Sequence, residues 1–324
     1  MTKGTTGKFI NQKCQKLVTN AVLEAERLEN FDYNRIKINL MSLLSDGGMH
    51  TKIHFYGSRV IGLAHKESDL DIYIEYGDNF YSDKNVERDR QVLEMIARIF
   101  ENKTYQTWQI TAKILTASVP ILQVIYKPSN IKCDISVSNG LGVANSLMMA
   151  HIFNLQPEAK KFYQFMKIFL KRYKKYFEGY LLKLLVIFFL QNEKAFPSIK
   201  MIQENLSITL INGWPTVEIN TTRNISYYGL NEMKNYKSYI PKFFEFYSKF
   251  QYNKYVMSIY DGKQLERFKY EYQDEINEHI LCIFGPINRK HNIGKYPSRK
   301  DVEYFVKLSQ SLEGEFNKKY DFDS

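Results

Sequence analysis

The chain has 324 residues, of which 44% are hydrophobic, so it can bury a sizeable core, and we expect two domains. Lys and Arg outnumber Asp and Glu by 45 to 35, and the net charge of +10 favours an anionic partner, either nucleic acid or a phospholipid surface. Three isolated cysteines suggest neither a disulfide framework nor a zinc site. The sequence has no signal region and no apolar run near the roughly 20 residues that span a bilayer, so we expect a soluble, cytoplasmic protein without membrane contact.

The first part of the chain has the pattern of an α/β unit of about a hundred residues. Apolar residues at helical spacing predict helices over residues 14–29 and 34–45, and Asp46-Gly47-Gly48 ends the second. Short β-branched or aromatic runs bounded by turn residues predict strands, with a helix over residues 86–102 between the second and the third. The predicted strands are 52–56, 70–76, 109–115, 121–126 and 131–137.

The chain becomes mostly helical after residue 145. Its periodic, aromatic-rich segments predict a second domain without an internal repeat or a long flexible linker, packed tightly against the first around a shared cleft. The segment 207–230 predicts a loop and a hairpin, and the many Tyr and Phe residues are expected mainly in the core. The predicted helices are 157–173, 178–191, 198–206, 231–250 and a last one from Ser298 or Asp301 to about residue 317.

Two aspartates open the second predicted strand, in the sequence Asp69-Leu70-Asp71. Side chains alternate along a strand, so Asp69 and Asp71 share one face, about 7 Å apart, while Leu70 points into the core. An isolated Asp-x-Asp is usually a solvated turn. Two neighbouring carboxylates nevertheless require cations, and Mg²⁺ or Mn²⁺ accepts carboxylate and phosphate oxygens together.

Further residues complete this pattern. Gly57 allows the backbone to approach a phosphate, and the Ser58 hydroxyl can contact it. Asp134 lies on the alternating strand 131–137, and three carboxylates converge if that strand neighbours the strand of Asp69 and Asp71. Three carboxylates are the minimum for a two-metal site, in which one ion activates an attacking hydroxyl and the other neutralises the triphosphate.

The order Gly57-Ser58, Asp69-Leu70-Asp71 and Asp134 resembles the nucleotidyltransferase signature of the DNA polymerase β-like superfamily. Later motifs resemble those of noncanonical poly(A) polymerases and terminal uridylyltransferases. The resemblance implies an α+β fold in which a catalytic domain with a mixed sheet, residues 33–150, is joined to a mostly helical domain, residues 151–324. It also implies that an N-terminal helix within residues 1–32 packs on the helical domain, and that the cleft holds the nucleotide and the RNA end.

The resemblance also implies which residues contact the nucleotide. Departures from the family pattern are Glu178 and Gly179 in place of two serines, and Gly285 in place of an aspartate. The implied contacts are Gly57 and Ser58 with phosphate, Asn139 and Asn145 with the ribose, Lys167 and Lys171 with the triphosphate, Tyr180 with the base and His291 with the base edge. Simpler interpretations are a solvated basic helix end for the lysines, a core position for Tyr180, and a surface position for His291.

Three functions remain open from the sequence. The first is template-independent addition of nucleotides, UTP in preference to ATP, to an RNA 3′ end, with two Mg²⁺ or Mn²⁺ ions at Asp69, Asp71 and Asp134 and release of pyrophosphate. The second is poly(A) addition by the same site. The third is a catalytically weak protein that binds RNA or a partner through the cleft. No RNA recognition module is found, so the RNA would be selected by the basic surface or by an RNA-binding protein partner.

Overall fold

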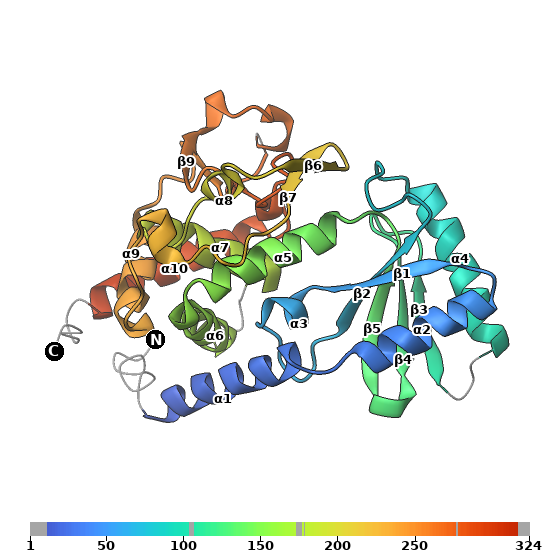
Figure 1. Ribbon diagram of the computed structural model, residues 1–324. Helices are drawn as coiled ribbons and strands as arrows, with labels where there is room; N and C mark the ends of the chain where they lie inside the picture. The colour runs from blue at the N-terminus through green and yellow to red at the C-terminus, as the bar shows by residue number, and fades with distance from the viewer. Residues whose placement is uncertain (1–11, 104–106, 173–176, 178, 277, 317–324) are drawn as a thin grey trace. The chain divides into compact units, whose positions relative to one another are not determined.

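The computed structural model describes residues 12–103, 107–172, 177, 179–276 and 278–316. The chain divides into two compact units (Figure 1). We call residues 24–151 and 206–219 the sheet unit, and residues 1–23, 152–205 and 220–324 the helical unit. Each unit is described by itself.

A mixed five-stranded sheet with the order β1-β2-β5-β4-β3 forms the centre of the sheet unit. Strand β2 runs parallel to β5, and the other neighbouring pairs are antiparallel. The sequence predicted all five strands to within one residue at each end, and it predicted the mixed sheet. The strands are β1 Thr51–Tyr56, β2 Leu70–Tyr76, β3 Trp108–Ile114, β4 Ile121–Tyr126 and β5 Ile131–Ser136.

Helices α2 (Asn34–Asp46) and α4 (Val86–Lys103) pack on one face of this sheet. Leu70, Ile72 and Ile74 of β2 point toward these helices and are fully buried, as the alternation predicted. Burial of this apolar face is the main source of the unit's stability. The opposite face therefore carries the residues between them, including Asp71.

Two helices lie beside the polar face of the sheet. Helix α3 (Ser58–Ile61) follows β1 directly, and α5 (Leu141–Asn154) follows β5. Helix α5 was missed in the sequence, because Gly140 and Gly142 obscure the helical pattern at its start. The predicted hairpin is present, as β6 (Ile208–Ile211) and β7 (Trp214–Val217).

Aromatic side chains fill the core of the helical unit, as their number predicted. Helix α7 is buried along its whole length from Leu181 to Gln191, which makes it the central helix of this unit. None of the described helices is long and apolar enough to cross a membrane. The helices are α1 Gln12–Glu29, which ends in the sheet unit, α6 Pro157–Arg172, α7 Gly179–Asn192, α8 Ile199–Gln203, α9 Tyr239–Lys249 and α10 Arg299–Phe316.

The structure corrects two of the predicted helices and adds a small sheet. Helix α8 ends before Asn205, whose positive φ of 59° turns the chain, and not at residue 206. Helix α9 begins at Tyr239 and not at residue 231, with Pro241 in its first turn, where proline is tolerated. The sheet of β8 (Tyr255–Ser258), β9 (Lys263–Glu266) and β10 (Ile283–Phe284) was not predicted, because strands this short carry little alternation.

Candidate active site

Two of the three predicted carboxylates are direct neighbours across adjacent strands. Asp71 of β2 and Asp134 of β5 are Cα partners in the parallel pairing, so their side chains leave the same face of the sheet. Asp69 stands two residues before Asp71, directly before β2 begins at Leu70. The structure thus confirms that the strand of Asp134 neighbours the strand of Asp69 and Asp71.

The surroundings of these carboxylates oppose further negative charge. Burial raises the pKa of Asp134, a hydrogen bond from Gln123 Nε2 at 3.0 Å lowers it, and the charge of Asp69 raises it again. Tyr56 hydrogen-bonds Ser136 through its hydroxyl at 3.1 Å, and burial, followed by the charge of Asp71, raises its pKa well above the ordinary value. Because burial and neighbouring carboxylates disfavour negative charge here, a bound cation would stabilise the ionised carboxylates.

Gly57 brings the backbone very close to this carboxylate face. Its φ is +77°, and a Cβ atom added there would lie 1.8 Å from Oδ2 of Asp71. Its N–H donates a hydrogen bond of 2.8 Å to Ser146 Oγ of α5, so this amide does not point at a phosphate. Ser58, the half-buried first residue of α3, follows this turn, and its contact with a phosphate stays a prediction.

The donor set fits a hard divalent cation. Asp69, Asp71 and Asp134 supply carboxylate oxygens, the ligands that Mg²⁺ and Mn²⁺ prefer, and the missing side chain of Gly57 leaves room beside Asp71. Within the described ranges, no three His, Cys, Asp or Glu side chains are already arranged to hold a metal ion. Convergence of all three carboxylates on an ion would therefore need side-chain movement, which is expected where like charges repel each other.

The two asparagines predicted to contact the ribose lie at α5. Asn139 precedes the helix, and its Oδ1 accepts a hydrogen bond of 3.1 Å from the Leu141 backbone N–H, which fixes the start of α5. Asn145 is half-buried within α5, one residue before the serine that holds Gly57. Both asparagines therefore lie at α5, the helix whose Ser146 hydrogen-bonds Gly57. Their contact with a ribose stays a prediction.

Lys167 and Lys171 lie one turn apart on α6, in the helical unit. Lys167 is half-buried and Lys171 is exposed, and burial followed by the charge of Lys171 lowers the pKa of Lys167. Neither lysine forms an ion pair with an acidic residue in the part of the chain that the structure describes. Two adjacent cations without counter-charge are suited to an anion such as a triphosphate.

Tyr180 and Gly285, two motif positions more than a hundred residues apart, lie side by side. A Cβ atom at Gly285 would lie 3.4 Å from the Tyr180 hydroxyl oxygen, which is an ordinary contact. Gly179 is exposed at the start of α7, and Glu178 lies outside the described residues. The aspartate that the family places at position 285 would therefore stand next to the tyrosine that is expected to stack on the base.

His291 is held by a residue that sequence reasoning missed. Its Nε2 lies 2.8 Å from the hydroxyl of Tyr296, and the two rings stack with centroids 5.6 Å apart. Asn292, by contrast, is fully buried, and its Oδ1 accepts hydrogen bonds from the N–H groups of Ile283 and Gly294. Asn292 is thus a structural residue that shapes the loop, and the contact with Tyr296 orients the imidazole of His291.

Family models match both units of the chain. Residues 10–154 match the model described as "Poly(A) RNA polymerase, mitochondrial-like, central palm domain", and residues 239–291 match "Cid1 family poly A polymerase". Together the two matched segments cover more than half of the chain.

Curated proteins and solved structures are similar to this chain at low identity. Terminal uridylyltransferase 4 of Homo sapiens is 26% identical over 273 residues, which are 79% of this chain, and the mitochondrial poly(A) RNA polymerase of Mus musculus is 22% identical over 260 residues, or 74%. The chain spans only 16% and 42% of the lengths of these two relatives.

The fold is shared with enzymes whose structures are solved. Cid1 poly(U) polymerase with bound MgGTP has a TM-score of 0.73 at 17% identity over 96% of both chains. The structure of mtPAP in complex with UTP has a TM-score of 0.73 at 17% identity, covering 96% of this chain and 71% of that one. The carboxylate pattern, the mixed sheet and both family models agree, and the chain belongs to the family of noncanonical poly(A) polymerases and terminal uridylyltransferases.

Proposed function

We propose that this chain adds nucleotides to the 3′ end of RNA without a template and releases pyrophosphate. The observation that carries this proposal is the pairing of Asp71 with Asp134 on parallel strands, with Asp69 two residues away and Gly57 against Asp71. The relatives support it by their names, which are terminal uridylyltransferases and a poly(A) RNA polymerase. The cytoplasmic location remains part of the proposal.

Each proposed role follows from the chemistry of the residue. Asp69, Asp71 and Asp134 would hold two Mg²⁺ or Mn²⁺ ions, which supply activation of the RNA 3′ hydroxyl and neutralisation of the triphosphate when bound. Lys167 and Lys171 would bind the triphosphate because they form a cationic pair without described counter-charges. The remaining contacts are Ser58 with phosphate beside the Gly57 turn, Asn139 and Asn145 with the ribose, Tyr180 with the base and His291 with the base edge.

The proposal is tested by extension of a labelled single-stranded RNA primer with UTP, ATP, CTP or GTP, in Mg²⁺ or Mn²⁺. We expect addition of uridylate or adenylate that stops when a chelator removes the metal. Metal-dependent extension with ATP in preference to UTP would favour poly(A) addition by the same site. No extension with any nucleotide, from protein that still binds RNA, would favour the catalytically weak binding protein, for which Glu178 and Gly179 in place of the two family serines are the supporting departures.

We expect a preference for UTP that depends on His291. Uracil presents O4 as an acceptor where adenine presents an amino donor, so an imidazole N–H held in place by Tyr296 favours uracil by about 1 to 3 kcal/mol when buried. His291→Ala should therefore shift the UTP to ATP ratio of kcat/KM toward ATP by roughly tenfold or more. Tyr296→Phe should shift it in the same direction by less, because the ring remains while its hydrogen bond is removed.

The ratio is measured for both nucleotides on one RNA primer, with His279→Ala as the matched histidine change elsewhere in the helical unit. That control should leave the ratio unchanged. An unaltered ratio in His291→Ala, or wild-type protein that already prefers ATP, would remove His291 from the nucleotide site.

A further inference from the structure

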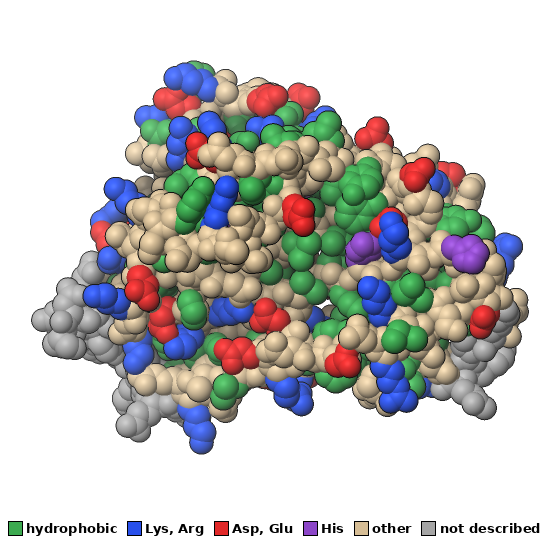
Figure 2. Space-filling model, in the orientation of Figure 1, with side chains coloured by type: hydrophobic (Ala, Val, Ile, Leu, Met, Phe, Trp, Pro, Cys, Tyr) green, Lys and Arg blue, Asp and Glu red, His purple; other side chains and the backbone are tan. Residues whose placement is uncertain are grey.

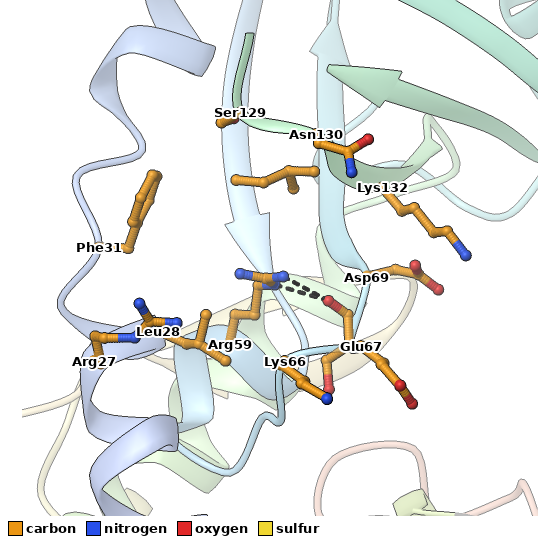
Figure 3. A pocket seen from close by; sticks show the side chains of 12 residues that line it. Arg27, Leu28, Phe31, Arg59, Lys66, Glu67, Asp69, Ser129, Asn130 and Lys132 are labelled. Atoms are coloured by element: carbon orange, nitrogen blue, oxygen red, sulfur yellow. Dashed lines mark hydrogen bonds between the residues drawn. The ribbon is translucent and has the colours of Figure 1, made fainter. Parts of the chain in front are cut away.

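A pocket of about 370 Å³ adjoins Asp69 within the sheet unit (Figure 3). The end of α1, the loop 66–69 and residues 129–132, where the turn after β4 passes into β5, form its walls. The loop leads into β2 and the turn into β5, so the pocket opens where the two strands that carry the carboxylates begin. None of the roles proposed above, apart from that of Asp69, uses this pocket.

The pocket has an excess of positive charge. Arg27, Arg59, Lys66 and Lys132 contribute four cations to its lining, against the two carboxylates of Glu67 and Asp69. Among the residues that the structure describes, none of these six side chains is joined to another charged group by an ion pair. Because the four cations outnumber the two carboxylates and form no ion pair among the described residues, the pocket is suited to an anionic ligand. The face drawn in Figure 2 carries basic and acidic side chains interspersed with each other.

Arg59 is a buried cation that hydrogen bonds hold in place in the wall of the pocket. Its side chain is only 5% exposed, yet its partners are neutral: Nε and Nη2 donate to the Ser68 carbonyl at 3.0 and 2.7 Å, and Nη1 donates to the Tyr33 hydroxyl at 3.1 Å. A buried cation is costly, and bonds to neutral acceptors leave its charge uncompensated. The same bonds anchor the residue directly before Asp69, so the wall next to the catalytic carboxylate is rigid.

An aromatic ring at the pocket adds a second recognition element. Phe31 is 42% exposed and lies in the lining across the pocket from Asp69 and Lys132 (Figure 3). Its ring contacts Tyr33 with centroids 4.9 Å apart, which supports it from one side. An exposed aromatic face beside uncompensated cations is the combination that binds single-stranded nucleic acid, by base stacking and by phosphate contacts.

We propose that this pocket binds the acceptor RNA next to its 3′ end, with a base stacked on Phe31 and backbone phosphate held by Lys66 and Lys132. The inference rests on the proposed function, which places the reacting 3′ hydroxyl at the carboxylates. Lys132 shares the alternation of Asp134 and stands two residues before it on β5, about 7 Å along the strand. A phosphate at Lys132 is therefore within one nucleotide of the reacting end.

The test compares RNA affinity with nucleotide affinity. Binding of a labelled 15-nucleotide oligouridylate is measured by fluorescence anisotropy in chelator, and binding of UTP with Mg²⁺ by calorimetry. The double variant K66E/K132E should weaken RNA binding at least tenfold, and Phe31→Ala should weaken it roughly five- to a hundredfold. The affinity for UTP should change less than threefold. K66Q/K132Q should reduce the slope of log K against log salt by about 0.7 for each phosphate that the variant no longer neutralises.

Matched controls separate the pocket from general charge and aromatic content. Arg98→Glu reverses an exposed charge on α4 and Tyr81→Ala removes an exposed ring, both in the sheet unit and outside the pocket. Each should leave RNA affinity within twofold of wild type. K66R/K132R should retain binding, and thermal denaturation verifies that every variant is folded.

The outcomes distinguish this inference from the proposed function. Wild-type protein that extends RNA while the folded pocket variants bind RNA normally would overturn the pocket assignment alone. Loss of UTP affinity in place of RNA affinity would also overturn it, because the pocket would then serve the incoming nucleotide. Wild-type protein that neither binds nor extends RNA would overturn both.

Discussion

Asp71→Asn and Asp134→Asn are each expected to lower kcat/KM for nucleotide addition by at least ~10³-fold, since metal ions contribute several kcal/mol to such transition states and ~1.4 kcal/mol is tenfold in rate. The substitution keeps the size of the side chain and removes one of the charges that bind metal. Asp71 and Asp134 lie on the polar face of the sheet and take no part in the apolar packing under α2 and α4. Activity should therefore be lost without loss of the fold.

Stability without metal should stay the same or rise in these variants. Burial, and then the charge of Asp69, raise the pKa of Asp134 and so disfavour its ionised form, and a neutral amide at position 134 removes both penalties. Thermal denaturation with and without Mg²⁺ measures this directly. Mg²⁺ with UTP should stabilise the wild type by binding only the folded state, and it should stabilise the variants much less.

Asp78→Asn is the matched control, because Asp78 is exposed in the turn that follows β2. It should retain activity and the stabilisation by Mg²⁺. Near wild-type addition by Asp71→Asn or Asp134→Asn would contradict the two-metal assignment. If a variant lost activity only because it unfolded, the carboxylate would have a structural role, and the proposed functional role would be contradicted.

Gly57→Ala is the second change with a large expected effect. The backbone at Gly57 has φ +77° and ψ −159°, a region that is essentially restricted to glycine and costs about 1 to 3 kcal/mol for other residues. The added Cβ would also lie 1.8 Å from Oδ2 of Asp71, so either that carboxylate or the turn must move. We expect the free energy of unfolding to fall by about 1 to 3 kcal/mol, and addition to fall on the order of a hundredfold or more, because small misplacements at a reacting centre are this costly.

Gly48→Ala separates the backbone effect from the steric effect. Gly48 has a similar φ of +83°, but nothing lies within 4 Å of a Cβ atom added there. This control should lose stability by a comparable backbone penalty and keep its activity. Chemical denaturation and primer extension are measured on both variants. Equal activity in the two would show that the approach of Gly57 to Asp71 is unimportant.

Local patterns determined the secondary structure of the sheet unit. Each strand from β1 to β5 is an alternating or fully apolar run between turn residues, and strands of this kind are readable because one face is buried and the other is not. The same alternation predicted that Asp69 and Asp71 share one face. The order of Gly57-Ser58, the aspartate pair and Asp134 predicted the family, and the family model that matches residues 10–154 supports it.

Other local signals were too weak to interpret. Helix α5 begins with glycines, which lower helix propensity, and its start depends on the Asn139 side chain. The strands of the sheet β8-β9-β10 have two to four residues, which is too short for a period to be visible. The sequence pattern predicted a helix from residue 231, but α9 begins at Tyr239. The pattern by itself does not distinguish the helix from the non-helical segment that precedes it.

The tertiary structure alone decided which residues support the site. Asp71 and Asp134 became neighbours only through the parallel pairing of β2 with β5, which a sequence read segment by segment does not contain. Tyr296 at His291, Ser146 at Gly57 and Arg59 at Ser68 are single polar contacts without periodicity. Such contacts depend on side-chain positions that only the tertiary fold decides. The sequence by itself therefore determined the family and predicted the three carboxylates, whereas the structure decided how Asp71 and Asp134 are held and which pocket lies beside them.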